Sequence, residues 1–188
     1  MSGKSEEAIF IMGKNAFAEI CSKIGCEHLH IRQEKEDSSG GMKDKGHKRP
    51  DLLVNIPDLT SLFVDVKVRQ QVEAGSSNEL SGVKAFEVDC HDFWKMKKLQ
   101  GRMRISSWYA FIEMKGATGI YESPAFLVPL SRVEKNIPEK IMSKLEKDEE
   151  VFWRVRIPMR CMNEWDTRID LNDKCQGCVD QYCKLFPK

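Results

Sequence analysis

The chain has 188 residues, with 30 Lys and Arg against 29 Asp and Glu and a formal net charge of +1. Because the charges balance, the chain as a whole has no strong positive electrostatic potential. A nucleic-acid partner would therefore have to bind to local basic patches. No apolar run approaches the 18 or so residues of a membrane span, and the N-terminus lacks the apolar core of a signal peptide. We therefore expect an intracellular protein without a membrane partner, large enough for one domain with a substantial core.

The N-terminal part predicts a helix, a strand and a long polar loop. Apolar residues recur at three- and four-residue spacings over residues 5–24, and Gly25 follows as a helix C-cap. The pattern of residues 28–33 predicts a strand, and residues 34–48, which are rich in Ser, Gly and Lys, predict a loop. Lys48 and Arg49 end this basic stretch and are candidates for contacting a phosphate backbone. The alternative is a solvated loop tip without a ligand.

Two short apolar runs, residues 52–56 and 62–68, are separated by turn residues and predict a β-hairpin. The second run alternates with a period of two, so its valines share one face and Phe63, Asp65 and Lys67 share the other. Placing an acid and a base side by side on a half-buried strand is costly unless the charges have a function. The alternative is an exposed face with an ordinary salt bridge.

The hairpin also predicts a divalent-metal site. Asp51 at the head of one strand and Asp65 on its neighbour can bring two carboxylates together, and hard cations such as Mg²⁺ prefer oxygen ligands of this kind. Lys67 lies on the same face as Asp65, where it can orient or deprotonate a water molecule or neutralise a phosphate.

The stretch Pro50-Asp51, followed after thirteen residues by Asp65-Val66-Lys67, resembles the motif of the PD-(D/E)XK nuclease superfamily. The resemblance implies an α/β fold, a restriction-endonuclease-like mixed central sheet flanked by helices in the order αβββαβ. It also implies Mg²⁺- or Mn²⁺-dependent hydrolysis of phosphodiester bonds, with DNA favoured as the substrate. The two acids and the Val66 carbonyl would hold the metal, and Lys67 would lie beside the attacking water. Junction-cutting and restriction members act as dimers, so a homodimer is a further expectation.

The superfamily often completes its metal site with a glutamate on the first helix. Glu19 is our choice, and the pair Glu6 and Glu7 is the alternative. At the place where related enzymes often carry this acid, the chain has Gly13 and Lys14 instead. A solvent-facing role is the alternative for each glutamate.

Residues 83–101 predict a second helix, and its basic side chains include Lys95 and Lys98, which we expect to contact phosphates. The alternative is a solvated helix face with cations near the C-terminal end. The elements expected beyond it are strands over residues 107–113 and 125–130, a helix over 138–150 and a strand over 151–157.

The last part of the chain is rich in cysteine, and we separate it as a small extension, residues 158–188, from a nuclease-like domain, residues 1–157. Its cysteines can close a tetrahedral structural Zn²⁺ site; they are Cys161, Cys175, Cys178 and Cys183. The tail also resembles that of iron–sulfur nucleases, which implies a 4Fe-4S cluster with Cys21 or Cys26 as the distant ligand. Free cysteines in a docked helix are the third interpretation.

The function predicted from these residues is a metal-dependent endo- or exonuclease. The competing hypothesis is a catalytically inactive nuclease-like scaffold that binds nucleic acid or a protein partner. A structural zinc protein, in which the strand carboxylates only pair with Lys67, is a third interpretation. The motif leaves open whether the substrate is duplex, branched or single-stranded.

Overall fold

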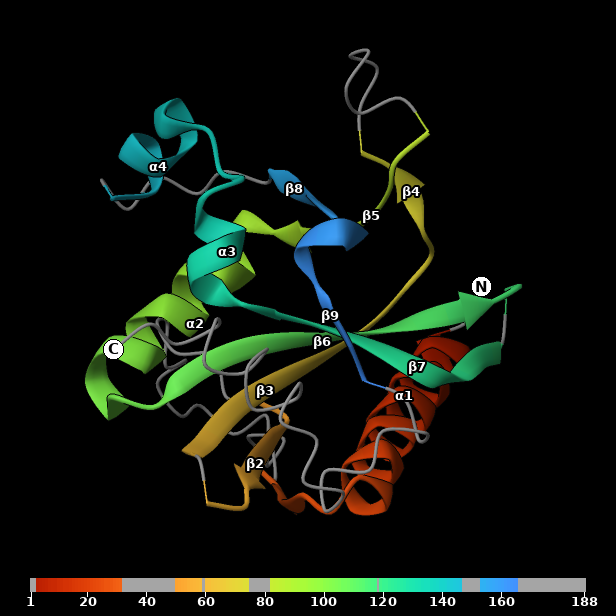
Figure 1. Cartoon of the computed structure of the whole chain (residues 1–188). Coiled ribbons are helices and arrows are strands. Elements are labelled where there is room, and N and C mark those ends of the chain that lie inside the picture. Colours follow the sequence, from red (N-terminus) through yellow and green to blue (C-terminus); the bar gives the residue numbers. More distant parts are fainter. Residues whose placement is uncertain are drawn as a thin grey trace, which may run out of the picture.

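The described residues form a mixed central sheet of six strands in the order β1-β2-β3-β6-β7-β9 (Figure 1). The computed structural model describes residues 3–31, 50–58, 60–74, 82–117, 119–146 and 153–165. Strands β3 and β6 are parallel, and the other neighbours are antiparallel. The strands span β1 (Glu27–His30), β2 (Leu52–Ile56), β3 (Thr60–Arg69), β6 (Ser106–Lys115), β7 (Gly119–Pro129) and β9 (Asn163–Trp165).

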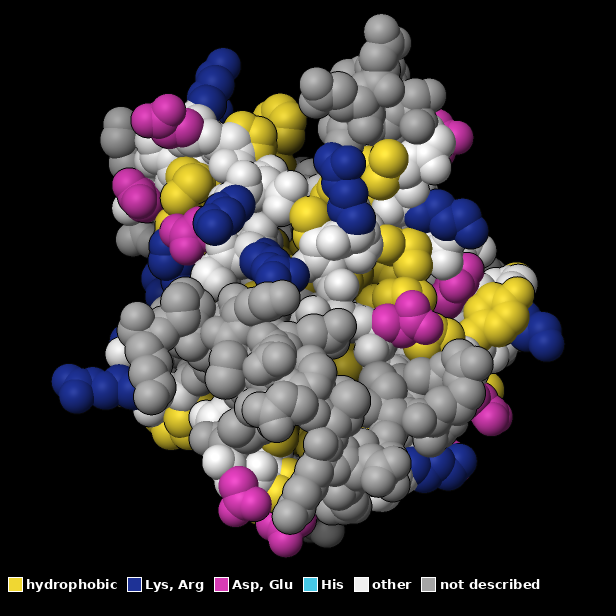
Figure 2. Space-filling model, in the orientation of Figure 1, with side chains coloured by type: hydrophobic (Ala, Val, Ile, Leu, Met, Phe, Trp, Pro, Cys, Tyr) yellow, Lys and Arg dark blue, Asp and Glu magenta, His cyan; other side chains and the backbone are white. Residues whose placement is uncertain are grey.

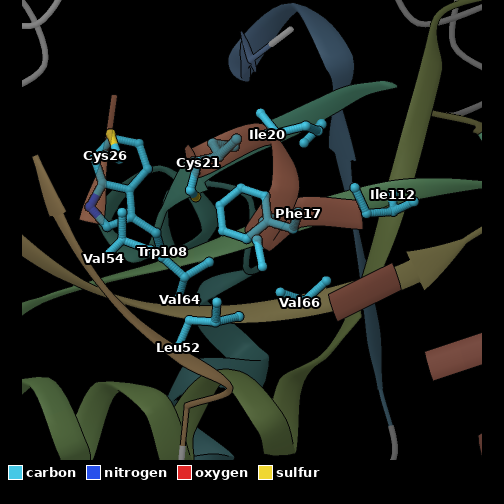
Figure 3. Packing of buried hydrophobic residues seen from close by; sticks show 14 of the residues in the cluster. Phe17, Ile20, Cys21, Cys26, Leu52, Val54, Val64, Val66, Trp108 and Ile112 are labelled. Atoms are coloured by element: carbon cyan, nitrogen blue, oxygen red, sulfur yellow. The ribbon is translucent and has the colours of Figure 1, made fainter. Parts of the chain in front are cut away.

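Helix α1 (Gly3–Lys23) covers one face of this sheet. Its apolar side chains, Phe17 and Ile20 among them, pack against the valines of β3 and against Trp108 of β6 (Figure 3). The period-two pattern of β3 places Val64 and Val66 on this face, where they are at most 2% exposed. Removing these side chains from water is the main driving force for docking α1 onto the sheet.

The opposite face carries a second layer, which contains α2 (Cys90–Met103), α3 (Leu130–Glu134) and α4 (Glu139–Glu146). A smaller sheet in the order β4-β5-β8 completes it, with β4 (Val72–Glu73), β5 (Lys84–Asp89) and β8 (Arg154–Pro158). Phe86 of β5 stacks on Phe111 of β6 at 4.9 Å between ring centroids, which ties the two sheets together. Both faces of β3 are therefore covered, whereas its alternating sequence predicted one buried face.

The predicted fold class is confirmed, since a mixed central sheet lies between helices on both faces. The elements follow the order α1-β1-β2-β3-β4-β5-α2-β6, which is the expected αβββαβ order with β4 and β5 inserted before the second helix. The predicted hairpin is also present, with Leu52 opposite Val64 in antiparallel register.

The helix predicted over residues 83–101 is wrong in its first part. Residues 84–89 form β5, which pairs with β4 on one side and β8 on the other, and α2 begins only at Cys90. Phe86 and Val88 are buried in this strand. Strand pairing with a segment some 70 residues away overrides the local helical spacing, because tertiary packing outweighs propensity.

The division at residue 157 remains a prediction. Within the proposed extension, residues 163–165 form β9, which pairs with β7 at the edge of the central sheet. Cys175, Cys178 and Cys183 lie outside the described residues. None of the helices in the described part of the chain is long and apolar enough to cross a membrane.

Gly13 determines how closely α1 approaches β3. A Cβ atom at this position would lie far inside contact distance of Val68 Cγ2. We predict that Gly13→Ala lowers the free energy of unfolding by about 1–3 kcal/mol, because the stiff valine cannot move away without repacking. Urea unfolding followed by circular dichroism measures the change.

Gly101→Ala on α2 is the matched control, because a Cβ atom there meets nothing within 4 Å. This substitution should stabilise the protein by up to about 1 kcal/mol through helix propensity alone. A Gly13→Ala variant as stable as the Gly101→Ala variant would contradict the close-packing argument.

Candidate active site

The buried charged side chains of the described residues gather around one end of the β2–β3 hairpin. Asp51, Asp65 and Lys67 are 5%, 2% and 6% exposed, respectively. Asp65 and Lys67 lie on the face of β3 opposite the valines, because successive side chains of a strand alternate between faces. They therefore point toward the α2 layer. Buried charges are retained in folded proteins only when they are paired or have a ligand.

Asp51 lies immediately before β2 and continues its pairing with β3 through its backbone N–H, which donates to the Val64 carbonyl at 2.9 Å. Strand β2 has no backbone group opposite Val66 of β3. The Asp51 carboxylate takes that place, since its Oδ2 accepts a hydrogen bond from the Val66 N–H at 2.8 Å. The other oxygen, Oδ1, lies 2.7 Å from the Lys14 ammonium of α1. Asp51 is thus held by β3 and by α1 together.

Lys67 is held between two carboxylates. Its Nζ lies 3.0 Å from Asp65 Oδ2 on the same strand and 2.6 Å from Asp92 Oδ2 in the first turn of α2. The ring of Tyr109 lies beneath it, with the Lys67 Nζ 6.0 Å from the ring centroid. Tyr109 is opposite Asp65 in the parallel β3–β6 pairing, so both side chains belong to the same face of the sheet. Two layers of the fold therefore fix the position of the Lys67 ammonium.

Burial and neighbouring carboxylates shift the pKa values of two groups in this region. Burial raises the pKa of Asp51, the neighbouring Asp65 carboxylate raises it further, and hydrogen bonding and charge from Lys14 oppose the shift. The pKa of Tyr109 is raised well above its usual value by burial and by Asp65 and Asp92. The Tyr109 hydroxyl is buried without a hydrogen-bond partner among the described residues. Additional positive charge near Asp51 and Asp65 would relieve these interactions.

The structure brings Asp51, Asp65 and Lys67 together but does not bring Glu19 to them. Glu19 is exposed, and its carboxylate pairs with Lys23 at 2.6 Å. It lines a surface pocket with Glu122 of β7, a strand separated from β3 by β6. Glu6 and Glu7 are exposed on the first turns of α1. The α1 side chain that contacts the Asp51 carboxylate is Lys14.

The predicted phosphate-binding residues are described only in part. Lys95 is half-buried and Lys98 is exposed, both on α2, whereas Lys48 and Arg49 lie outside the described residues. In the view of Figure 2, the Lys and Arg side chains of the described surface are interspersed with acidic and apolar side chains. This mixture agrees with the net charge of +1 and leaves nucleic-acid binding by these residues a prediction.

The described cysteines do not form a metal centre. The described residues contain no group of three or more His, Cys, Asp and Glu arranged to hold a metal ion. Cys161 is partly buried in a short 3-10 helix, Met159–Cys161, and its carbonyl accepts a hydrogen bond from Arg132. Cys21 of α1 and Cys26, which follows this helix, pack in the core, where burial raises both thiol pKa values, that of Cys26 to about 11. Zinc or iron–sulfur binding by the tail therefore gains no support here.

Sequence reasoning did not assign Lys14, Asp92 and Tyr109 to this site. Lys14 occupies the helix position where the resemblance predicts an acid. This departure from the family pattern can be read from the sequence and could have pointed to a role for Lys14 in the site. Asp92 lies within the helix predicted over residues 83–101, and the error in the start of α2 hid its relation to Lys67. Tyr109 lies in the strand predicted over residues 107–113, but only the β3–β6 register places it opposite Asp65.

Comparison with known proteins gives little. No family model matches the sequence, and no curated protein matches it. The chain is similar to the solved structure of Hjc, a Holliday junction resolvase from the archaeal hyperthermophile Archaeoglobus fulgidus. The identity is 10%, the match covers 79% of this chain and 87% of that chain, and the TM-score is 0.46. A likeness of this strength supports no inference about function, which has to be argued from the residues themselves.

The raised pKa of Asp51 predicts a pH-dependent effect of Asp51→Asn without metal. A raised pKa means that the folded protein holds the proton more firmly than the unfolded chain, whose value is near 3.8. The contribution of Asp51 to stability is then complete below that pH and is lost as the pH rises through the folded-state pKa. The asparagine variant should therefore gain stability relative to the wild type as the pH rises above the unfolded-state value of 3.8.

Urea unfolding in EDTA at several pH values measures this difference. A difference between the two proteins that is independent of pH, or that falls as the pH rises, would show that Lys14 and Val66 compensate the buried charge completely.

Proposed function

We propose that this chain is a divalent-metal-dependent nuclease that hydrolyses phosphodiester bonds of nucleic acid, with DNA as the expected substrate. The observation that carries the proposal is the convergence of Asp51, Asp65 and Lys67 at one end of the β2–β3 hairpin, all three buried. Two neighbouring carboxylates with an ammonium group beside them are the side-chain types that metal-assisted phosphodiester hydrolysis uses. The Asp51–Val66 hydrogen bond holds one of these carboxylates against the strand that carries the other two residues.

The donor set fits Mg²⁺ or Mn²⁺. Asp51 and Asp65 supply carboxylate oxygens, which hard cations prefer, and the charge of Asp65 adds to burial in raising the pKa of Asp51. The N–H and C=O groups of one strand residue point to the same side, so the Val66 carbonyl faces the side of β3 on which Asp51 lies. These three residues would hold the cation, which would polarise the phosphate and stabilise developing negative charge.

Lys67 would position the attacking water and Asp92 would position Lys67. The ammonium group donates a hydrogen bond to Asp92 and forms an ion pair with Asp65, so its place is fixed by the start of α2 and by a strand residue. Charged hydrogen bonds of this kind preorganise a catalytic group before the substrate arrives. Lys95 and Lys98 of α2, together with Lys48 and Arg49, would contact phosphates along the strand.

The inactive-scaffold hypothesis also has an observation in its favour. The Lys14 ammonium already neutralises Asp51 at 2.7 Å, so this carboxylate has a partner without any metal. A scaffold of this kind would bind nucleic acid or a protein without hydrolysis. Cleavage assays separate the two hypotheses directly.

The test is cleavage of labelled single-stranded, duplex and branched DNA and of RNA, with Mn²⁺, with Mg²⁺ and with EDTA. We expect metal-dependent cleavage by the wild type and a loss of about a hundredfold or more in Lys67→Ala and in Asp65→Asn, the usual cost of removing a catalytic group. Lys23→Ala is the matched control, because Lys23 is exposed on α1 and pairs with Glu19. Its activity should equal that of the wild type.

Cleavage that persists in EDTA, or that is unchanged in Lys67→Ala, would refute the proposed mechanism. Binding of nucleic acid without cleavage under all conditions would refute the nuclease proposal and favour the scaffold.

Asp92→Asn tests the positioning of Lys67. The expected result is a smaller loss of kcat than in Lys67→Ala, with partial recovery in Asp92→Glu, which retains the charge. A variant that raises only KM would show that Asp92 acts in substrate binding instead.

A further inference from the structure

Lys14 reaches Asp51 because α1 lies unusually close to β3 at that point. Gly13 faces Val68 with no side chain between them, and the next residue of the helix is Lys14. Its ammonium lies 2.7 Å from Asp51 Oδ1, where the lysine side chain is 30% exposed and the aspartate side chain only 5%. The contact thus joins a buried anion to a cation that retains access to solvent.

In the described part of the chain, the cation that forms an ion pair with Asp51 is Lys14. Lys67 is engaged with Asp65 and Asp92 on the α2 side of the sheet. Burial raises the pKa of Asp51, the Asp65 carboxylate raises it further, and Lys14 opposes this shift. Lys14 therefore occupies the electrostatic role beside Asp51 that a bound cation would otherwise fill.

We infer that Lys14 is a built-in counter-ion that competes with a divalent cation for Asp51 and so weakens cation binding at the Asp51–Asp65 pair. This inference rests on the proposed function for the identity of the cation site. A metal ion and an ammonium group repel each other at one carboxylate, so cation binding requires the flexible lysine to move away. Its partial exposure gives it solvent to move into.

The test is binding of Mn²⁺ alone to the full chain, measured by titration calorimetry without nucleic acid. Lys14→Gln removes the competing charge, and we expect Mn²⁺ to bind roughly tenfold more tightly, as for the loss of one close charge at a partly exposed site. The melting temperature of the metal-free variant should fall below that of the wild type, and Mn²⁺ should raise it more than it raises the wild-type value.

Lys23→Gln is the matched control, since it removes the same charge from the same helix at an exposed pair with Glu19. It should leave Mn²⁺ affinity at the wild-type value. The double variant Lys14→Gln with Asp51→Asn should lose the gained affinity, because the gain depends on the Asp51 carboxylate.

An unchanged or weaker Mn²⁺ affinity in Lys14→Gln would overturn the inference, as would tight binding that survives Asp51→Asn. These results are independent of the cleavage assay. If Lys14→Gln gains Mn²⁺ affinity while no variant cleaves nucleic acid, the counter-ion role of Lys14 stands and the nuclease proposal fails. If the wild type cleaves with metal and Lys14→Gln binds Mn²⁺ no better, the nuclease proposal stands and the counter-ion role fails.

Discussion

The hydrogen bond from the Val66 N–H to the Asp51 carboxylate is the contact on which the site depends. Strand β2 begins at Leu52, whereas β3 extends to Arg69, so the backbone of β3 beyond Val64 loses its antiparallel partner. Asp51 continues the pairing with a side-chain oxygen at 2.8 Å. A carboxylate thereby enters the interior of the fold beside a strand that carries Asp65 and Lys67, and burial there makes its charge sensitive to every neighbouring group.

The buried charges connect three separate elements of the chain. Lys14 reaches Asp51 from α1, and Asp92 reaches Lys67 from α2, on the two layers that enclose the central sheet. Each ion pair would be weak at the surface, but removing one partner from a buried pair leaves an uncompensated charge. The geometry of the site and the packing of the two layers are therefore coupled, and the close approach of α1 at Gly13 is part of that coupling.

The nuclease and the scaffold hypotheses differ in what neutralises Asp51. In the metal-free protein this role belongs to Lys14, at a position where an acidic residue was expected from the resemblance. A site of this composition can remain folded and paired without a cation. Its two carboxylates still repel each other, and this repulsion favours the binding of a cation. In the proposed mechanism, affinity for a cation and stability without one are opposing demands, and Lys14 is the side chain through which the fold would balance them.

The sequence alone determined the α1 helix, the β2–β3 hairpin and the shared face of Asp65 and Lys67, because these depend on local spacing and turn residues. It also identified Asp51 as their partner through the spacing of the motif. The start of α2, the position of Glu19 away from the hairpin and the contacts of Lys14 and Asp92 were decided by tertiary structure. Periodicity indicates which face of a helix is buried. The position along the strand at which the helix docks depends on long-range packing instead. Here the contact between Gly13 and Val68 determines the position of α1 along β3. Lys14, rather than a glutamate, therefore lies beside Asp51.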